Sequence, residues 1–296
     1  MLGPLSDIGR ERVVTLMSAN RDTTLWLDDH QETLDILAAM PWLRRLQATS
    51  LRLRSITAVD NTPDLIEVSM GDTLRPVSLE PLRGRTSLRS LNLRGTWRDV
   101  DVLSSLTGLR SLVIGGIDLA LLEPLRELGS LDSGLGRITN FELLPSIGVL
   151  RDVSLYRVRG LADVTALGAI PSLRHLSLQA MSAISALPSF RDSPELRRID
   201  LETMTSVTDL QPIADAPSLR YLLLIEMPKL DPEALRPLVE HPSLRAGVWG
   251  LGSKRKNFAA QDILPLPPEP YGYAEARGLA PAPPLVNPWL ADDLSS

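Results

Sequence analysis

One short phrase recurs along this sequence at a nearly fixed interval. Leu150-Arg-Asp-Val-Ser-Leu155 is followed by related phrases that open at Leu173, Leu196 and Leu219, each 23 residues after the one before. A less regular copy opens 25 residues later at Leu244. A period of this length, with aliphatic residues at positions 1, 4 and 6, indicates a solenoid in which each repeat buries its apolar face only against its neighbours.

The same register extends toward the N-terminus. An apolar residue lies nine positions before every leucine that we predict to open a strand. These opening residues are Leu43, Leu65, Leu88, Leu109, Leu131, Leu150, Leu173, Leu196, Leu219 and Leu244. The repeat at Leu131 is irregular, because Gly134 and Gly136 fall where inward residues belong. We therefore expect a bend or break near residues 131–141, or a slipped register that turns Leu135 and Ile138 inward.

Each repeat combines two patterns. Positions 4 and 6 alternate with polar neighbours, which is typical of a short strand with one buried face. Apolar residues spaced by three, as in Val100, Leu103 and Leu106, suit a helical or 3-10 segment on the opposite wall. The predicted fold class is an α/β repeat solenoid, with a curved parallel β-sheet on the concave face and short helical segments on the convex face. We expect an N-terminal cap over residues 1–23, ten to eleven repeats over 24–250 and a proline-rich C-terminal tail over 251–296.

These repeats resemble the leucine-rich repeat family, and in particular the short bacterial type found in internalins. Thr208-Asp-Leu-Gln-Pro-Ile213 is similar to the convex wall of that type. The asparagine that the family carries at position 9 is replaced here, so the resemblance predicts apolar packing in place of an asparagine ladder. The replacing residues are Leu51, Thr73, Thr96, Ile117, Val158, Met181, Met204 and Met227. Repeat arrays of the family often serve as the sensor part of larger receptors, which implies a binding role.

The outward positions 3, 5, 7 and 8 vary between repeats, as expected of a surface that faces a specific partner. Tyr and Arg are favoured at interface hot spots, and both occur at these positions. We predict a protein ligand on the concave face, bound by Asp152, Tyr156, His175, Gln179, Arg198, Asp200, Glu202 and Tyr221. His175 is expected to be an exposed or ligand-contacting side chain. Leu223, Ile225 and Val248 form an exposed aliphatic patch beside this surface, which we expect the C-terminal tail or a partner to cover.

Composition restricts the remaining functions. The chain has no cysteine, three histidines and a net charge of −5, so we expect no enzyme, no catalytic residue, no metal and no cofactor. The negative net charge argues against nucleic acid as a partner. No apolar run is long enough for a membrane span. The predicted location is cytoplasmic. Two alternatives stay open: binding of nucleic acid or an anionic surface through the arginines at position 2, and regulation of a partner enzyme. The arginines are Arg44, Arg89, Arg110, Arg151, Arg174, Arg197, Arg220 and Arg245.

Overall fold

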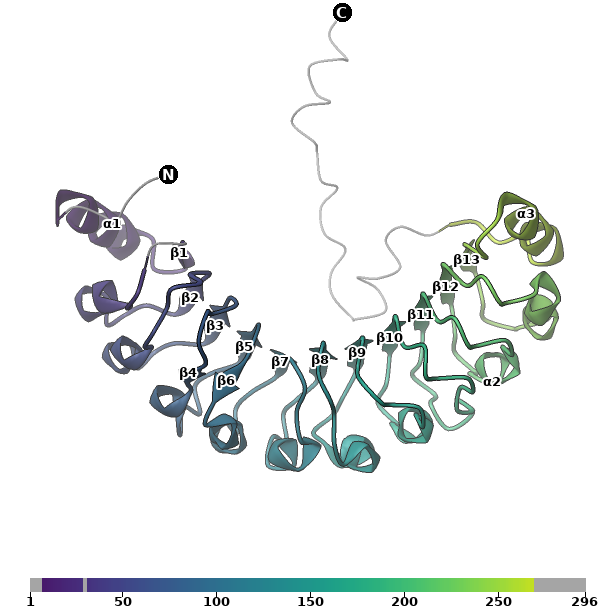
Figure 1. The fold of residues 1–296 in the computed structure, drawn as a ribbon, viewed down its shortest axis with the longest axis horizontal. Coiled ribbons are helices and arrows are strands. Elements are labelled where there is room, and N and C mark those ends of the chain that lie inside the picture. Colours follow the sequence, from purple (N-terminus) through teal and green to yellow (C-terminus); the bar gives the residue numbers. More distant parts are fainter. Residues whose placement is uncertain (1–6, 29–30, 269–296) are drawn as a thin grey trace, which may run out of the picture.

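A computed structural model describes residues 7–28 and 31–268, which form an arc-shaped solenoid (Figure 1). Parallel strands line the inner, concave side of the arc, and helical segments line the outer, convex side. Eleven strands of the described chain form one sheet in sequence order. They are β1 (Leu25–Leu27), β2 (Arg45–Ala48), β3 (Glu67–Met70), β5 (Ser90–Leu93), β7 (Ser111–Ile114), β8 (Ser130–Gly134), β9 (Asp152–Tyr156), β10 (His175–Gln179), β11 (Arg198–Glu202), β12 (Tyr221–Ile225) and β13 (Ala246–Trp249).

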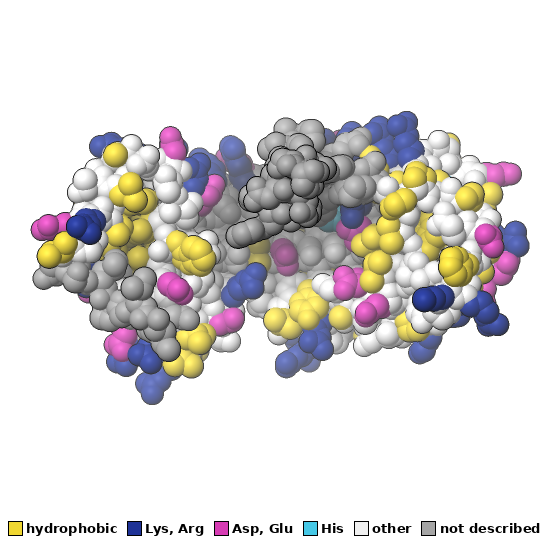
Figure 2. Space-filling model, turned by 90° about the horizontal axis from the view of Figure 1, so that it is seen from above, with side chains coloured by type: hydrophobic (Ala, Val, Ile, Leu, Met, Phe, Trp, Pro, Cys, Tyr) yellow, Lys and Arg dark blue, Asp and Glu magenta, His cyan; other side chains and the backbone are white. Residues whose placement is uncertain are grey.

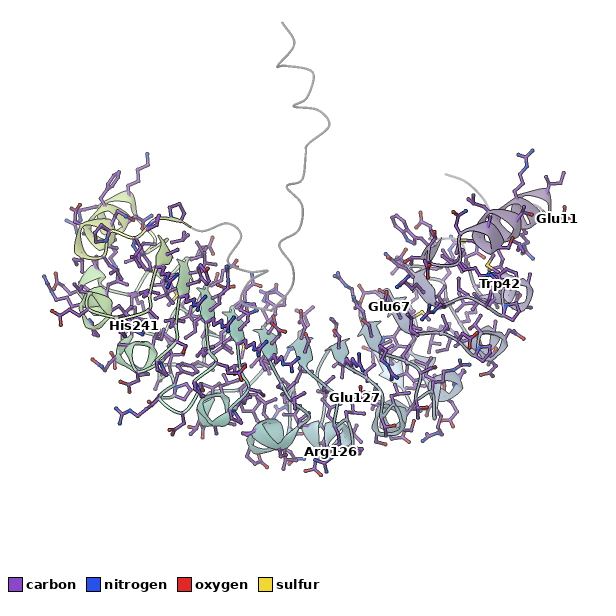
Figure 3. The ribbon with its side chains drawn as sticks, turned by 180° about the vertical axis from the view of Figure 1, so that it is seen from behind. Glu11, Trp42, Glu67, Arg126, Glu127 and His241 are labelled. Atoms are coloured by element: carbon purple, nitrogen blue, oxygen red, sulfur yellow. The ribbon has the colours of Figure 1, made fainter. Side chains whose placement is uncertain are left out.

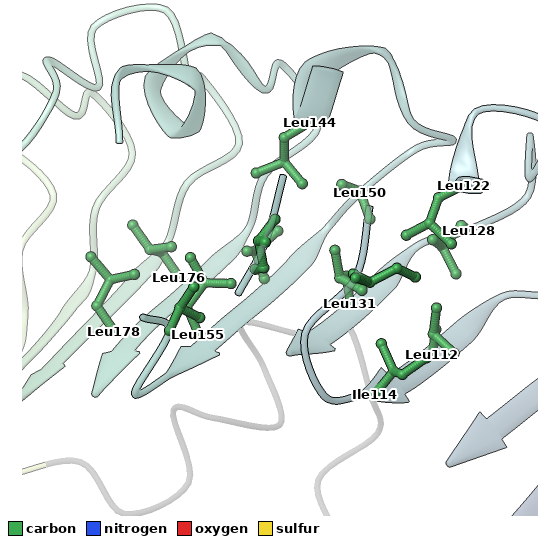
Figure 4. Close-up of a cluster of buried hydrophobic side chains, with 14 of the residues drawn as sticks. Leu112, Ile114, Leu122, Leu128, Leu131, Leu144, Leu150, Leu155, Leu176 and Leu178 are labelled. Atoms are coloured by element: carbon green, nitrogen blue, oxygen red, sulfur yellow. The ribbon is translucent and has the colours of Figure 1, made fainter. Parts of the chain in front are cut away.

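The repeat register determines how the strands pair. Position 4 of each repeat lies opposite position 4 of the next, as in Val153 with Leu176 and Leu176 with Ile199. Side chains at positions 4 and 6 therefore stack in columns inside the solenoid, where they are buried. Figure 4 shows part of this aliphatic core. The predicted fold class is confirmed, and its stability comes from burial between neighbouring turns.

The convex wall consists mainly of 3-10 turns, as the spacing of three predicts. In a 3-10 helix, side chains at i and i+3 lie on the same face, so leucines at this spacing all point inward. The amide of Leu37 donates to the carbonyl of Leu34, and that of Met40 donates to Leu37, both at 2.9 Å. The segments are η1 (Asp35–Ala39), η2 (Thr57–Asn61), η3 (Glu80–Leu82), η4 (Val100–Ser105), η5 (Leu119–Leu122), η6 (Phe141–Ser146), η7 (Thr165–Ala169), α2 (Gln211–Ala214) and η8 (Pro232–Leu238). A small second sheet pairs β4 (Val77–Ser78) with β6 (Trp97–Arg98).

The irregular repeat is continuous, and the opening residue predicted for it is wrong. Leu131 pairs with Val153 and Leu112, so it occupies position 4, and Leu128 opens the strand. Both leucines are buried, and the spacing of three runs through both, which made the opening ambiguous. No bend or break interrupts β8, which pairs with β7 and β9. Ile138 is buried as expected, whereas Leu135 has a φ of 58° and an exposed side chain.

Ser133 explains why this register was hard to find. It occupies position 6, an inward position that leucine or isoleucine fills in most repeats, and it is fully buried. Its hydroxyl donates a hydrogen bond of 2.7 Å to the carbonyl of Gly115 in the preceding repeat. A buried hydroxyl is tolerated where it is hydrogen-bonded, so a polar residue replaces an aliphatic one here without leaving an unpaired group.

In the C-terminal half, methionine side chains occupy the position at which the family carries asparagine. Met181, Met204 and Met227 are buried at position 9 of consecutive repeats. The amide of Val158 lies 3.2 Å from the sulfur of Met181, which acts as a weak acceptor. Flexible thioether side chains fill irregular gaps, so apolar packing joins these turns.

Helices lie at both ends of the described solenoid. At one end is α1 (Asp7–Ala19), and at the other is α3 (Lys254–Ile263), which packs on η8 and β13. The segment predicted as a tail thus begins with a helix, in which the Nζ of Lys256 donates to the carbonyls of Pro228 and Leu230. The proline-rich residues from 269 onward lie outside the described residues.

Candidate protein-binding surface

The register places the eight predicted ligand-binding residues on one patch of the concave sheet. Position 3 runs from Asp152 through His175 and Arg198 to Tyr221 on β9, β10, β11 and β12. Position 7 runs beside it, from Tyr156 through Gln179 and Glu202 to Ile225, and position 5 supplies Asp200 between them. Neighbouring parallel strands lie about 4.8 Å apart, so these side chains adjoin one another. We call this set the concave patch.

His175 is the centre of a buried polar network, not an exposed side chain as predicted. Its Nε2 lies 3.0 Å from Oδ2 of Asp200, and its Nδ1 lies 3.8 Å from Oδ1 of Asp152. The Nε of Arg198 donates to both oxygens of Asp200, at 2.8 and 2.9 Å. The side chain of His175 is only 5% exposed, and carboxylates from the strands on both sides lie against its ring.

The network affects the protonation of His175. Burial lowers the pKa of the imidazole, but hydrogen bonds to Asp152 and Asp200, with the charges of these carboxylates, raise it more. The net result is a pKa above the ordinary 6.5. Within the described residues, no group of three or more His, Asp and Glu side chains could hold a metal ion. The hydrogen bonds of Arg198 and the contact of His175 to Asp200 join these side chains into one polar network.

The position 7 column is the part of the patch outside the His175 network. Tyr156, Gln179 and Glu202 are each partly exposed. Tyr221, at position 3, is only 9% exposed and is therefore largely buried. The guanidinium of Arg157 lies 5.8 Å from the centre of the Tyr156 ring, at a distance that permits a cation–π interaction.

A hollow of ≈ 670 Å³ adjoins Tyr156 on the N-terminal side. It is lined by glycines at the ends of β5, β7 and β8, which have no side chains to fill it, and by the charged residues Arg94, Asp132 and Arg137. The turns of two repeats touch here: a Cβ at Gly136 would lie 2.3 Å from the amide nitrogen of Gly116. Glycine is therefore required for the close packing of these turns.

The arginine column follows the rim beside the concave sheet. Arg110 pairs with Glu127 at 2.9 Å, and Arg174 pairs with Glu195 at 2.7 Å. Glu127 is one of the residues labelled in Figure 3. The guanidinium of Arg89 donates to the carbonyls of Thr86 and Gly108. These three arginines contact the following repeat and so have a structural role that needs no ligand.

Trp26 is a surface residue that the sequence analysis did not identify. It occupies position 5 of β1 opposite Gln47, and its ring is 65% exposed on the concave side. Its Nε1 donates to the hydroxyl of Thr49 at 3.3 Å. The period of the repeats, continued one turn toward the N-terminus, would have placed this tryptophan among the outward residues.

Comparisons with solved structures agree with the architecture. An internalin of Listeria monocytogenes (InlF) is 18% identical, with 88% of this chain and 94% of that chain covered and a TM-score of 0.54. A leucine-rich repeat protein of Leptospira interrogans is 14% identical, covering 84% and 71%, with a TM-score of 0.52. TLR13, solved in complex with ssRNA13, is 18% identical, covering 83% of this chain and 42% of that one, with a TM-score of 0.51.

These likenesses show the leucine-rich repeat fold, and the resemblance inferred from the sequence is confirmed at that level. No protein-family model and no curated relative matches the sequence. Among the helices that the structure describes, none has both the length and the apolar character needed to cross a bilayer.

Proposed function

We propose that this protein is a non-catalytic interaction module that binds a protein ligand through the concave patch on β9, β10, β11 and β12. The observation that carries the proposal is the His175 network beside the accessible column of Tyr156, Gln179 and Glu202. Hydrogen bonds hold the network side chains in place before any ligand arrives, so binding costs less side-chain entropy. The sensor part of a larger system is a role that suits such a module.

The patch has a chemical preference. Asp152, Asp200 and Glu202 supply three carboxylates, against the guanidinium of Arg198 and the imidazole of His175. Glu202 is partly exposed, lies outside the His175 network and is next to Gln179 in register. A partner segment with a basic or hydrogen-bond-donating residue opposite Glu202 and an apolar group against Tyr156 suits this surface. A partner enzyme regulated by such binding is one form of the same proposal.

The arginine column is the basis of the competing proposal of nucleic-acid or anionic-surface binding. Arg110 and Arg174 are engaged by carboxylates and Arg89 by backbone carbonyls, so these side chains are less available to phosphates. Phosphate binding would fall steeply with salt concentration. Contacts to Tyr156 and Gln179 would depend on salt much less.

The test is capture of partners from native lysate at low and high salt. Wild type is compared with Tyr156→Ala and Glu202→Arg on the patch, and with Glu240→Arg, an equal change of charge at an exposed residue outside the patch. We expect a protein that both patch variants lose and Glu240→Arg retains. Capture of nucleic acid alone, released by salt and indifferent to Tyr156, would overturn the proposal.

A further inference from the structure

The concave face becomes apolar toward its C-terminal end. Where β12 meets β13, Leu223 lies opposite Val248, and Tyr221 lies opposite Ala246. These positions correspond to Asp200 and Arg198 one strand earlier. Leu223 and Val248 are only partly buried, and hydrophobic side chains gather over the C-terminal strands in Figure 2.

A groove runs across this apolar end. Its shallow part is lined by Arg198, Tyr221, Leu223, Ala246, Gly247 and Val248. It continues at Gly247 and Val248 into a hollow of ≈ 530 Å³ whose far wall is formed by Gln261 and residues 265–268. We call the two together the terminal groove. It combines an aromatic ring, two aliphatic side chains and prolines on its wall.

The chain itself leads into the terminal groove. After α3 it turns back along the outer edge of β13, where Nε1 of Trp249 donates to the carbonyl of Leu264 at 3.0 Å. The amide of Gly247 donates to the carbonyl of Pro267, also at 3.0 Å. Pro268, the last residue that the structure describes, lines the same hollow as Gly247 and Val248. The chain's own backbone therefore occupies the edge of the sheet at this point.

We propose that the terminal groove binds the chain's own proline-rich segment, residues 269–296. This segment carries five prolines, three aromatic residues (Tyr271, Tyr273 and Trp289) and five charged residues. Extended proline-rich chains dock in grooves lined by aromatic side chains, because their restricted backbone loses little entropy on binding. Its 28 residues span up to about 85 Å at 3.1 Å per residue, so reach does not limit docking across strands about 4.8 Å apart.

This inference goes beyond the proposed function, since it concerns a contact made within the chain. Docked residues would cover Leu223 and Val248, which would otherwise present an apolar patch to solvent. They would also lie next to Arg198, which belongs to both the terminal groove and the concave patch. A ligand that reaches β12 would then compete with the segment at that end of the patch.

Trypsin cleavage of the full chain tests the proposal. Arg277 is the only Lys or Arg after Lys256, so release of residues 278–296 reports on one bond. We expect cleavage in wild type to be at least tenfold slower than in a free peptide of residues 269–296. Leu223→Asp and Val248→Asp should each restore fast cleavage, with a smaller effect from the milder Leu223→Ser. Val239→Asp, at an exposed valine after η8, should leave the protection intact.

Two outcomes would overturn the proposal. One is wild-type cleavage as fast as that of the free peptide. The other is protection that appears only at high protein concentration, which would assign the terminal groove to the segment of a second copy. Circular dichroism of each variant confirms that the repeats stay folded, so faster cleavage is read as release of the segment alone.

Discussion

The Nε2 atom of His175 on β10 lies 3.0 Å from Oδ2 of Asp200 on β11, and Arg198 donates to both oxygens of the same carboxylate. One carboxylate thus holds two potentially cationic side chains in place. On the other side of the ring, Nδ1 of His175 lies 3.8 Å from Asp152 on β9. Three adjacent strands are therefore joined on the concave side by a network that also orders the surface beside Tyr156.

The first prediction concerns the dependence of stability on pH. The pKa of His175 is raised above 6.5 in the folded protein, so folding favours the protonated imidazole. This stabilisation is fully present below about pH 6.5 and is lost as the pH rises through the folded-state pKa. We expect the melting temperature of wild type to fall more between about pH 6 and pH 8 than that of His175→Gln. Parallel slopes in calorimetric melts of the two proteins would refute this role for His175.

The second prediction tests the register of the irregular repeat. Leu131 is fully buried at position 4, whereas Leu135 points into solvent. Leu131→Ala should therefore destabilise the protein by about 2–5 kcal/mol, and Leu135→Ala by no more than about 0.5 kcal/mol. Urea unfolding of both variants measures the difference. Equal losses, or the reverse order, would support the slipped register.

Much of the fold was predictable because each repeat presents the same pattern to the same environment. Leu155, Leu178 and Leu201 are buried for one reason, and recognising one position identifies the others. Prediction failed where a repeat replaces packing by a specific contact. Ser133 is inward only because Gly115 accepts its hydrogen bond, and no spacing in the sequence reveals that acceptor.

The candidate site was predictable as a location but less so in its chemistry. Strand register alone placed Asp152, His175 and Arg198 next to one another. The strand register does not predict that His175 is buried, because register does not show that the carboxylates of Asp152 and Asp200 turn toward its ring. The network forms because Asp200, two residues after Arg198 and on the same outward face, reaches both Arg198 and His175.

The third prediction concerns the methionines at position 9. Met204 is fully buried between Met181 and Met227 in consecutive repeats. Met204→Ala should cost about 2–5 kcal/mol, because the cavity left in the stacked turns cannot close completely. Met204→Leu nearly conserves volume and should cost less than about 1.5 kcal/mol. Chemical denaturation of both variants compares the two costs, and equal losses would contradict a packing role.

The last prediction separates a structural lysine from its neighbour in Lys254-Arg-Lys256. The ammonium of Lys256 donates to the carbonyls of Pro228 and Leu230, at 2.7 and 3.0 Å, and so attaches α3 to the preceding repeat. Arg255 is exposed. Lys256→Met should destabilise this end by about 1.5–3 kcal/mol, and Arg255→Met, which removes the same charge, by no more than about 0.5 kcal/mol. Native-state hydrogen exchange is the right measurement, because terminal repeats can open without global unfolding. We expect faster exchange in β12 and β13 for Lys256→Met alone. Equal exchange in both variants would show that the hydrogen bonds of Lys256 do not stabilise this end.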